Sequence, residues 1–373
     1  MRADDRGGAP LPLRRVHRAR HPLRALAREL HPGRRRAQRL RHLSAPAEGR
    51  RDRAADDAVR HGIRAARDRR HARREPPARE GAQDRVGKDA RVIGRLAIVG
   101  VGLLGGSVAL AARADGVARE IVGVGRDRRR LEGPLRAGMV DRILTDVEAG
   151  VEGADCVVLA ATVLANERLL ETIWGRVPAG ALVTDVGSTK RGIVAVAERL
   201  AATRPLGFLG SHPMAGSEKS GWQVARADLF RGATVIVTPT DATEPRATKG
   251  ITALWEALGA RVAALDPETH DRTVAAISHL PHVAAWALVD AVGRFEPGAL
   301  AFAARGFRDT TRIAASDPPM WRDVLLANAD AVRASLGAFR AALDDLERLL
   351  AAGDAAGIEA LLARLKTVRE GVA

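Results

Sequence analysis

RLAIVGVGLLGGSVALAARADG, residues 95–116, is the most informative stretch of this sequence. A short apolar strand pattern leads into a glycine-rich turn, and an Ala- and Leu-rich helix pattern follows. Glycines permit the tight turn and let the backbone approach a pyrophosphate, while the helix N-terminus stabilises negative charge. Another strand pattern follows about twenty residues later, so the G-x-G-x-x-G match has the context of a dinucleotide-binding loop. The loop residues predicted to contact the dinucleotide are Gly100, Val101, Gly102, Leu103, Leu104 and Gly105.

Strand and helix patterns alternate from residue 91 to residue 266, which predicts an α/β domain with a Rossmann-like, doubly wound parallel sheet. From residue 267 to residue 373 the pattern changes to long Ala- and Leu-rich helices without strand signals. We expect an all-helical substrate and dimerisation domain there, because such helices would otherwise expose wide apolar faces. The strands are expected at 96–99, 120–127, 155–161, 181–187, 208–213, 233–239 and 261–266, and the late helices at 268–292, 297–304, 318–349 and 354–369.

The net charge of +15 belongs to one segment, residues 1–90. These residues hold 26 Lys and Arg against 12 Asp and Glu, whereas residues 91–373 hold 34 against 33. The segment is rich in Arg, Ala, Pro and Gly, so it cannot bury enough apolar surface to offset its ordering entropy. We predict a low-complexity extension that is disordered or weakly helical. A start-site or reading-frame artefact, a targeting or regulatory tail, and an anion- or nucleic-acid-binding segment all remain open for it.

Cysteine and histidine usage indicates the compartment and argues against metal chemistry. Cys156 is the single cysteine, so no internal disulfide can form and a reducing, cytoplasmic setting fits. The ten histidines lack a compact ligand spacing with carboxylates, so no metal site is expected. No apolar run reaches the length of a membrane span, and residues 1–30 lack the apolar region of a secretory signal.

The choice between NAD and NADP depends on the end of the second strand, which reads GVGRD at residues 123–127. NAD enzymes often place a carboxylate there for the ribose 2′-hydroxyl, but Gly125 occupies that position. Arg126 could bind a 2′-phosphate, which slightly favours NADP. Asp127 could serve NAD if the strand ends two residues later, and both cofactors stay open.

A histidine stands out in SHPMAGSEKSGW, residues 211–222. His212 is expected in a loop at the carboxyl end of a strand, where ligands of doubly wound sheets bind. A nicotinamide enzyme that oxidises an alcohol needs a base for the hydroxyl proton, and a neutral imidazole can accept it. Ser188, expected at the end of another strand, could hold the ring in orientation. Taken alone, His212 would more often be a structural histidine.

Five stretches together resemble the prephenate and arogenate dehydrogenases, the TyrA family of tyrosine biosynthesis, over roughly residues 95–370. They are GVGLLGGS (100–107), DVGSTK (185–190), HPMAGSE (212–218), HDRTVAAISHLPH (270–282) and GFRDTTRIAASDPPMWRDVLLAN (306–328). The resemblance implies oxidative decarboxylation of prephenate to 4-hydroxyphenylpyruvate, with His212 as the base and a nicotinamide as the hydride acceptor. It also implies a homodimer formed through the helical domain.

The resemblance carries further residue roles. Arg312 would bind a substrate carboxylate and Asp309 would orient it, although the two could instead form a surface ion pair. Ser217 and Glu218 would line the entrance, with Glu218 as a possible gate. The other residues expected near the substrate are Lys190, Ser278, His279, His282 and Trp321; for these the simpler interpretations are a solvated lysine, core or capping histidines and a core tryptophan. His270 is expected to be a structural contact at a helix start.

Three other functions compete with prephenate oxidation. Arogenate carries an ammonium in place of the side-chain ketone and would favour an acidic neighbour, so prephenate is preferred. A nucleic-acid-binding protein on a non-catalytic scaffold rests only on the clustered charge of residues 1–90. A general β-hydroxyacid dehydrogenase would need a lysine in the helical domain, and residues 270–330 contain none. No pattern of a C-terminal ACT domain or an N-terminal chorismate mutase is present.

Overall fold

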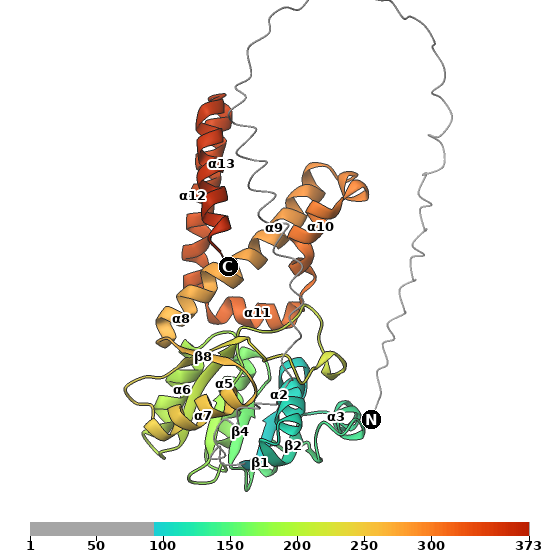
Figure 1. Cartoon of the computed structure of the whole chain (residues 1–373), viewed down its shortest axis with the longest axis vertical. Coiled ribbons are helices and arrows are strands. Elements are labelled where there is room, and N and C mark those ends of the chain that lie inside the picture. Colours follow the sequence, from blue (N-terminus) through green and yellow to red (C-terminus); the bar gives the residue numbers. More distant parts are fainter. Residues whose placement is uncertain (1–92, 373) are drawn as a thin grey trace, which may run out of the picture. The chain divides into compact units, whose positions relative to one another are not determined.

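The computed structural model describes residues 93–372, so the predictions for residues 1–90 lie outside the described residues. Figure 1 shows an α/β part, drawn from cyan to yellow, followed by a helical part drawn from orange to red. The predicted fold class, a Rossmann-like sheet followed by helices, is confirmed. Strands end at Ala264 and the helical part begins at Pro267.

An eight-stranded sheet with the order β3-β2-β1-β4-β5-β6-β7-β8 forms the centre of the α/β part. The chain proceeds from β1 outward to β3 and then returns to place β4 on the other side of β1. This reversal next to β1 is the switch point at which doubly wound sheets bind ligands, outside the carboxyl ends of the strands. The strands are β1 Ile93–Val99, β2 Ala118–Val124, β3 Arg142–Leu144, β4 Cys156–Leu159, β5 Leu182–Asp185, β6 Gly207–Pro213, β7 Thr234–Thr238 and β8 Arg261–Ala264.

The sheet departs from the predicted all-parallel arrangement at β7. Strands β1 to β6 are parallel to their neighbours, whereas β7 is antiparallel to β6, and β8 runs parallel to β7. A parallel connection needs a crossover, usually a helix. Residues 214–233 between β6 and β7 contain only the short 3-10 helix Trp222–Val224, so the chain returns in the opposite direction.

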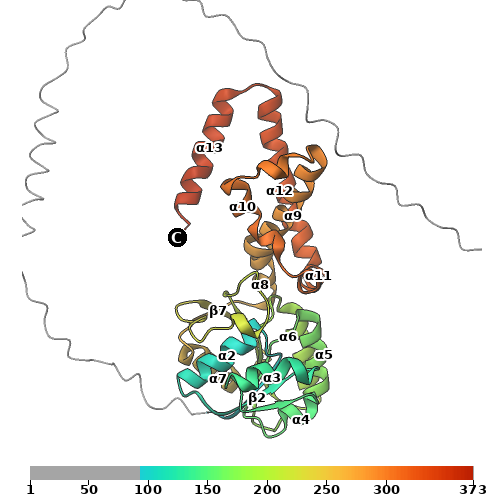
Figure 2. The ribbon, with the colours of Figure 1, turned by 90° about the vertical axis from the view of Figure 1, so that its right-hand side faces the viewer.

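Helices cover both faces of the sheet, as Figures 1 and 2 show. Successive strand residues point to opposite faces. Leu96 and Ile98 of β1 therefore join the core with α2, α3 and α7, while Ala97 and Val99 join the core with α4, α5 and α6. These helices are α2 Leu103–Ala114, α3 Arg128–Arg136, α4 Val147–Val151, α5 Val163–Ile173, α6 Arg191–Ala201 and α7 Pro245–Ala257.

The helical part contains two interruptions that the sequence pattern did not predict. A π-helical segment, Ala275–His279, lies between α8 and α9. Asn328 divides the predicted helix 318–349 into α11 and α12, with a φ of −124° and a ψ of 31°. The helices are α8 Pro267–Val274, α9 Leu280–Phe295, α10 Arg305–Thr311, α11 Pro318–Ala327, α12 Ala329–Ala351 and α13 Ala355–Glu370, with 3-10 segments at Ala299–Phe302 and Arg312–Ala315.

Much apolar surface of the helical part is exposed. Helix α12 buries only Val332, and α13 buries no residue. The stretch Pro267–Phe295 is long and apolar enough to cross a membrane, which corrects the expectation that no run reaches that length. Its buried His270 and Asp271 contact the α/β part, which favours a protein interface for the exposed residues. The large exposed apolar residues include Ile277, Phe295, Phe302, Leu326, Leu343, Leu350, Leu362, Leu365 and Val368.

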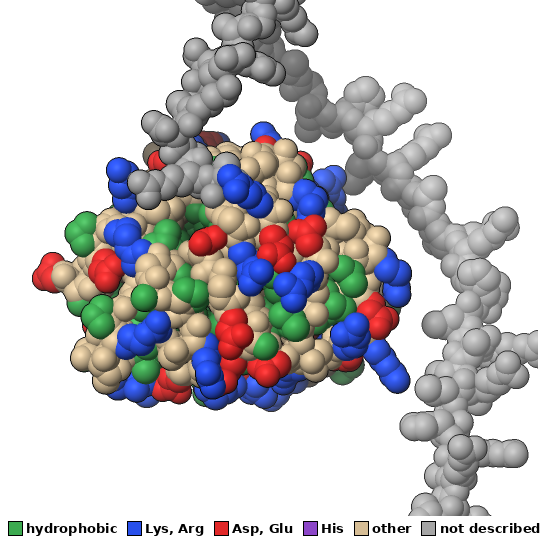
Figure 3. Space-filling view, turned by 90° about the horizontal axis from the view of Figure 1, so that it is seen from below, with side chains coloured by type: hydrophobic (Ala, Val, Ile, Leu, Met, Phe, Trp, Pro, Cys, Tyr) green, Lys and Arg blue, Asp and Glu red, His purple; other side chains and the backbone are tan. Residues whose placement is uncertain are grey.

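Charge on the described residues is balanced. On the face of the molecule drawn in Figure 3, Lys and Arg side chains alternate with Asp and Glu, and the visible side chains form no large patch of one sign. This distribution agrees with the near neutrality of residues 91–373 in the sequence. Nucleic-acid binding by this face has no electrostatic support.

Candidate active site

The glycine loop between β1 and α2 has the geometry that its sequence predicts. Gly100 has a φ of +103°, and a Cβ there would lie 2.6 Å from the carbonyl oxygen of Ala160. A Cβ on Gly105 would lie 2.1 Å from the Gly100 oxygen, so only glycine fits. At Gly102 a Cβ would meet no protein atom within 4 Å, which leaves space beside the N-terminus of α2. The first-turn N–H groups of a helix have no intrahelical acceptor, so this loop fits a pyrophosphate.

At the end of β2, the two candidate contacts for the ribose, Arg126 and Asp127, have different surroundings. The strand ends at Val124, so Gly125 follows it directly, where NAD enzymes often carry a carboxylate. Asp127 caps α3 and accepts a hydrogen bond from the Arg129 N–H at 2.9 Å. Arg126 is exposed beside the strand end. The Asp127 carboxylate therefore has a structural task, and Arg126 has none among the described contacts.

His212 lies within β6 and not in the loop after it, because β6 pairs with β7 through His212 and Pro213. Its side chain is almost fully buried. The Nδ1 atom of His212 is 2.9 Å from Nε2 of His270 on α8, and Nδ1 of His270 is 2.7 Å from Oδ1 of Asp271. A line of three polar side chains therefore joins β6 to α8. His270 lies in the first turn of α8 and contacts β6, so the expected structural contact at a helix start is confirmed, and its partner is the candidate base.

The hydrogen bonds fix the tautomers along this line. A carboxylate only accepts, so His270 must donate its Nδ1–H to Asp271. When the His270 ring is neutral, it accepts at Nε2, and His212 donates its Nδ1–H to that atom. The neutral His212 ring consequently carries its free lone pair on Nε2, the position a base needs. Burial lowers the pKa of His212 well below its usual value, and His270 and Lys190 lower it further, so the ring is neutral.

Asp271 anchors this line to the start of α6. Its Oδ1 accepts the backbone N–H of Lys190 at 2.8 Å, and its Oδ2 accepts that of Arg191 at 3.0 Å. Burial alone would raise the pKa of Asp271, but the hydrogen bonds from His270 and from the two backbone N–H groups lower it below its usual value. Asp271 is therefore a buried carboxylate that can stabilise a positive charge on His270 or His212.

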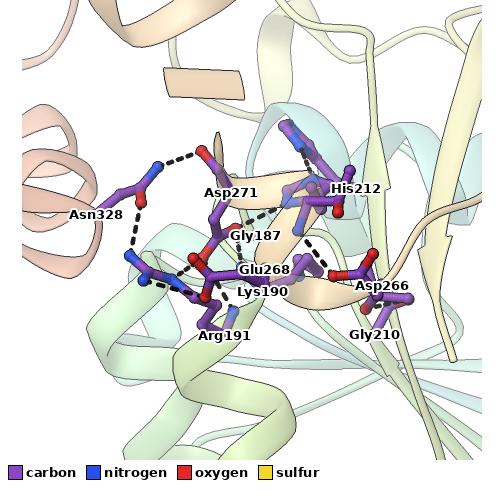
Figure 4. Close-up of polar contacts among 12 residues, drawn as sticks. Gly187, Lys190, Arg191, Gly210, His212, Asp266, Glu268, Asp271 and Asn328 are labelled. Atoms are coloured by element: carbon purple, nitrogen blue, oxygen red, sulfur yellow. Dashed lines mark hydrogen bonds and ion pairs between the residues drawn. The ribbon is translucent and has the colours of Figure 1, made fainter. Parts of the chain in front are cut away.

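Lys190 is fully buried, so it is not a solvated helix-start lysine. Its ammonium pairs with the buried Asp185 carboxylate at the end of β5. Asp185 also accepts the Gly187 N–H at 2.7 Å and the Ser211 N–H at 3.2 Å, which ties β5 to the residue preceding His212. Burial lowers the pKa of Lys190 and Asp185 opposes this shift. In Figure 4, Lys190 lies between Asp271 and Gly210.

Ser188 was expected to orient His212, but no hydrogen bond joins the two residues in the described part of the chain. The Nδ1 atom of the ring is held by His270, and Ser188 is half-buried in the loop after β5. The hydroxyl therefore remains available at the carboxyl edge of the sheet. Oriented histidine bases usually have an acidic or carbonyl partner, so the His-Asp pair at 270–271 was the signal that could have identified the real partner.

The second histidine group lies on the π-helical segment and the start of α9. His279 is buried and lies edge-on to Trp321, with ring centroids 5.8 Å apart. The His282 ring lies over Trp321 with centroids 3.8 Å apart, and its Nδ1 is 2.9 Å from the Ser278 carbonyl oxygen. Trp321 is 7% exposed and belongs to a small core with Val163 and Val324. The structure therefore brings His279, His282 and Trp321 together.

The Arg312 region shows one difference from the prediction. Arg312 pairs with Glu218 at 2.7 Å, whereas Asp309 pairs with Arg305 at 3.2 Å. Asp309 therefore does not orient Arg312, because its place four residues after Arg305 on α10 favours that pair. Ser217 accepts the N–H of Lys219 at 2.9 Å and shapes the loop that carries Glu218. Within residues 93–372 no three His, Cys, Asp or Glu side chains are grouped as a metal site.

A dinucleotide loop at the switch point of a doubly wound sheet and a buried neutral histidine are features of the nicotinamide-dependent dehydrogenases. The chain matches the prephenate dehydrogenase nucleotide-binding domain over residues 108–264 and the prephenate dehydrogenase dimerization domain over residues 266–367. It is 34% identical to a prephenate dehydrogenase of Bacillus subtilis over 279 residues, which cover 74% of this chain and 75% of the relative. The chain belongs to the prephenate dehydrogenase family.

Two of the solved structures that resemble this chain show the likeness in detail. The first is prephenate dehydrogenase from Aquifex aeolicus in complex with hydroxyphenyl propionate and NAD+, with a TM-score of 0.70 and 33% identity. That match covers 75% of this chain and 98% of the Aquifex chain. The second is arogenate dehydrogenase from Synechocystis, with a TM-score of 0.64 and 30% identity over 75% of this chain and all of that one. These likenesses support a nicotinamide cofactor and an oxidoreductase.

Proposed function

We propose that this chain oxidises and decarboxylates prephenate to 4-hydroxyphenylpyruvate, with His212 as the base. The observation that carries the residue assignment is the line His212–His270–Asp271, which leaves the lone pair of His212 on Nε2. A buried neutral imidazole is suited to take a proton from a hydroxyl group. The charge that develops on His212 is stabilised through His270 by the Asp271 carboxylate.

The proposed reaction balances without a further reactant. The bound nicotinamide supplies the hydride acceptor. His212 Nε2 takes the proton of the ring hydroxyl as the hydride leaves the same carbon, which gives a ring ketone. The bond to the ring carboxylate then breaks, carbon dioxide departs, and its electron pair makes the ring aromatic. His212 can return its proton to the phenolate oxygen, so positioning and one proton transfer are the main demands on the protein.

Arg312 is the proposed contact for a substrate carboxylate, with paired hydrogen bonds from its guanidinium. In the described structure Glu218 occupies that guanidinium, so a substrate carboxylate would replace Glu218. The expected result for Arg312→Ala is a KM for prephenate about 10- to 100-fold higher, since a charged hydrogen bond is lost, with kcat little changed. A fall in kcat without a rise in KM would contradict this role. Ser188, Ser217, Lys190, Ser278, His282 and Trp321 are the other proposed substrate contacts.

NADP is the proposed cofactor over NAD. Two features support it: Gly125 stands where NAD enzymes often have a carboxylate, and Asp127 is engaged as the cap of α3. Arg126→Ala should then raise the KM for NADP while the KM for NAD stays the same. Gly125→Asp should move the preference toward NAD. Equal KM values for both cofactors in the wild-type protein would contradict the proposal.

A homodimer through the helical part is the proposed assembly, because the matched family domain is a dimerization domain and α12 and α13 expose many apolar residues. Light scattering should give twice the mass of one chain.

Arogenate remains the second candidate substrate, since an arogenate dehydrogenase is among the relatives. Glu218 pairs with Arg312 in the described structure, and displacement by a substrate carboxylate would free it for an arogenate ammonium, so the preference for prephenate rests on the prephenate dehydrogenase relatives. The first experiment mixes the full chain with prephenate or arogenate and with NAD or NADP, and follows reduced nicotinamide. Turnover with prephenate supports the proposal. Turnover with arogenate alone would reverse the substrate assignment.

A further inference from the structure

Asn328, the residue that separates α11 from α12, is fully buried and lies at the centre of a second polar network. Its Oδ1 accepts a hydrogen bond from Nη2 of Arg191 at 2.9 Å. Its Nδ2 donates to the backbone oxygen of Asp271 at 2.7 Å and lies 3.3 Å from Nδ1 of His279. Figure 4 shows Asn328 bridging Arg191 and Asp271.

These partners fix the orientation of the Asn328 amide. A guanidinium only donates, so the atom facing Arg191 must be the amide oxygen. A backbone carbonyl only accepts, so the atom facing Asp271 must be the amide nitrogen. Arg191 itself is held firmly, because the Asp330 carboxylate binds both of its terminal nitrogens. The amide therefore cannot flip without loss of both hydrogen bonds.

The amide orientation in turn fixes the tautomer of His279. The second hydrogen of the Asn328 Nδ2 group points to Nδ1 of His279, which must accept and cannot carry a proton. Burial lowers the pKa of His279 to about 4, so the ring is neutral at physiological pH. The proton of the neutral ring must therefore lie on Nε2.

The His279 Nε2–H group has no acceptor within residues 93–372, although the side chain is only 1% exposed. Nε2 lies on the edge of the ring opposite the Asn328 contact. The ring lies edge-on to Trp321, with ring centroids 5.8 Å apart, and Asn328 joins it to the backbone of Asp271, the carboxylate at the end of the His212–His270 line. Leaving a buried donor unpaired is costly, so such groups often have a ligand or functional partner.

His282 has the opposite tautomer. Its Nδ1 faces the Ser278 carbonyl oxygen, so Nδ1 carries the proton and Nε2 accepts. Burial lowers the pKa of His282 as well, which favours the neutral ring. One turn of helix thus carries one imidazole that presents a donor and another that presents an acceptor.

We propose that Asn328 is a positioning residue that locks His279 as an Nε2–H donor, and that this donor binds an oxygen atom of the substrate. The inference rests on the proposed function for the identity of the ligand. The lock itself rests only on the contacts of Asn328, and no substrate is needed to observe it.

The lock is tested first without substrate, on the full chain labelled with 15N-histidine. Two-bond proton–nitrogen correlation spectra distinguish the two neutral tautomers, and the His279→Gln and His282→Gln variants assign the signals. The expected result is an Nε2–H tautomer for His279 and an Nδ1–H tautomer for His282. Asn328→Asp should convert His279 to an Nδ1–H or doubly protonated ring and leave His282 unchanged. Asp330→Asn, which weakens the hold on Arg191 but keeps the amide, is the matched control and should change neither. An Nδ1–H tautomer of His279 in the wild-type protein overturns the proposal.

The donor is tested by a pair of substitutions at His279. The glutamine amide nitrogen can take the place of Nε2, whereas the shorter asparagine cannot reach it. We expect His279→Gln to keep the KM for prephenate within about threefold of wild type, and His279→Asn to raise it about tenfold or more. The KM for the nicotinamide should change in neither. Equal KM values for both variants, or an effect on the nicotinamide alone, overturn the substrate contact. Absence of turnover in the wild-type protein with the predicted tautomers would instead refute the proposed function and leave the lock intact.

Discussion

The two parts of the described chain differ in how much of their apolar surface they bury. In the α/β part, strand residues such as Leu96, Ile98 and Leu159 are fully buried beneath helices on both faces. In the helical part, α13 buries nothing, and Leu362 is 55% exposed. A sheet covered on both faces has a complete core, whereas an uncovered helix hairpin needs a second surface. The difference teaches that the first part holds the dinucleotide loop on a sheet with a complete core, while the second leaves apolar helix surface uncovered.

The site lies where these two parts meet, so substitutions in each part test whether the comparison matters for activity. The largest effect is expected for His212→Asn in the α/β part. An asparagine cannot take the hydroxyl proton, and kcat should fall about 10²- to 10⁴-fold, the usual contribution of a general base. The Kd for prephenate, measured by calorimetry, should change little. Unchanged kcat, or loss of binding instead of turnover, would refute the role of His212.

Asp271→Asn makes the corresponding change in the helical part. An amide that donates to His270 Nδ1 would place the His270 proton on Nε2, facing the Nδ1–H of His212. The wrong tautomer should lower kcat about 10²-fold or more, by the same reasoning as for other histidine–aspartate pairs. Thermal unfolding serves as the control, since Asp271 also accepts the Lys190 and Arg191 backbone N–H groups. A kcat that follows only the loss of folded protein would show that the line is structural.

A pair of leucine substitutions tests the difference in burial directly. Leu170→Ala on α5 empties a fully buried position and should destabilise the protein by about 2–5 kcal/mol. Leu362→Ala on α13 removes contacts that one chain alone does not bury, so its cost should be below about 1 kcal/mol in dilute monomer. Urea unfolding at low and high protein concentration measures both. A large decrease in unfolding free energy for Leu362→Ala that does not depend on protein concentration would contradict an interface between two chains at α13.

A smaller effect is expected from pH. His279 has a pKa of about 4 in the folded chain, below its usual 6.5, so the unfolded chain binds the proton first as pH falls. Its contribution to stability is complete above about pH 6.5 and is lost as pH falls toward 4. His279→Gln should therefore reduce the difference in unfolding free energy between about pH 7.5 and about pH 5. An identical difference in both proteins would show that His279 is not held neutral by burial.

Local patterns predicted the α/β part well, because its signals lie close together in the sequence. The glycine loop needs Gly100 and Gly105 within a few residues of each other, and their backbone constraints can be deduced from the motif. The reversal of β7 follows from the connection at residues 214–233, which lacks a crossover helix, and the strand pattern of β7 itself does not indicate direction. The exposed helices were expected from their wide apolar faces, since a periodic pattern shows amphipathicity whether or not a partner is present.

The site was only partly predictable, because its contacts join residues that are far apart in the sequence. The sequence motifs indicated His212, Arg312 and the histidines of 270–282, but not which side chains touch. Ser188 was expected to hold His212 and His270 does so, although 58 residues separate the two histidines. No sequence pattern pointed to Asn328, because the role of a buried asparagine is recognised only from the hydrogen-bond donors and acceptors around it. Pairings across the junction follow from the packing of α8 and α12 against α6, which periodicity does not describe.

The π-helical segment Ala275–His279 has one further consequence, for the angle between the two histidine groups. Each residue of a regular helix advances the side-chain direction by about 100°. The wider turn of a π segment changes that advance, so His279 and His282 are rotated relative to His270 and Asp271 on the same continuous stretch. If the same residues formed a regular helix instead, the downstream rings would turn by roughly that angle. The single wide turn therefore sets the angle between His270, which contacts His212, and the His279 and His282 rings further along the same stretch.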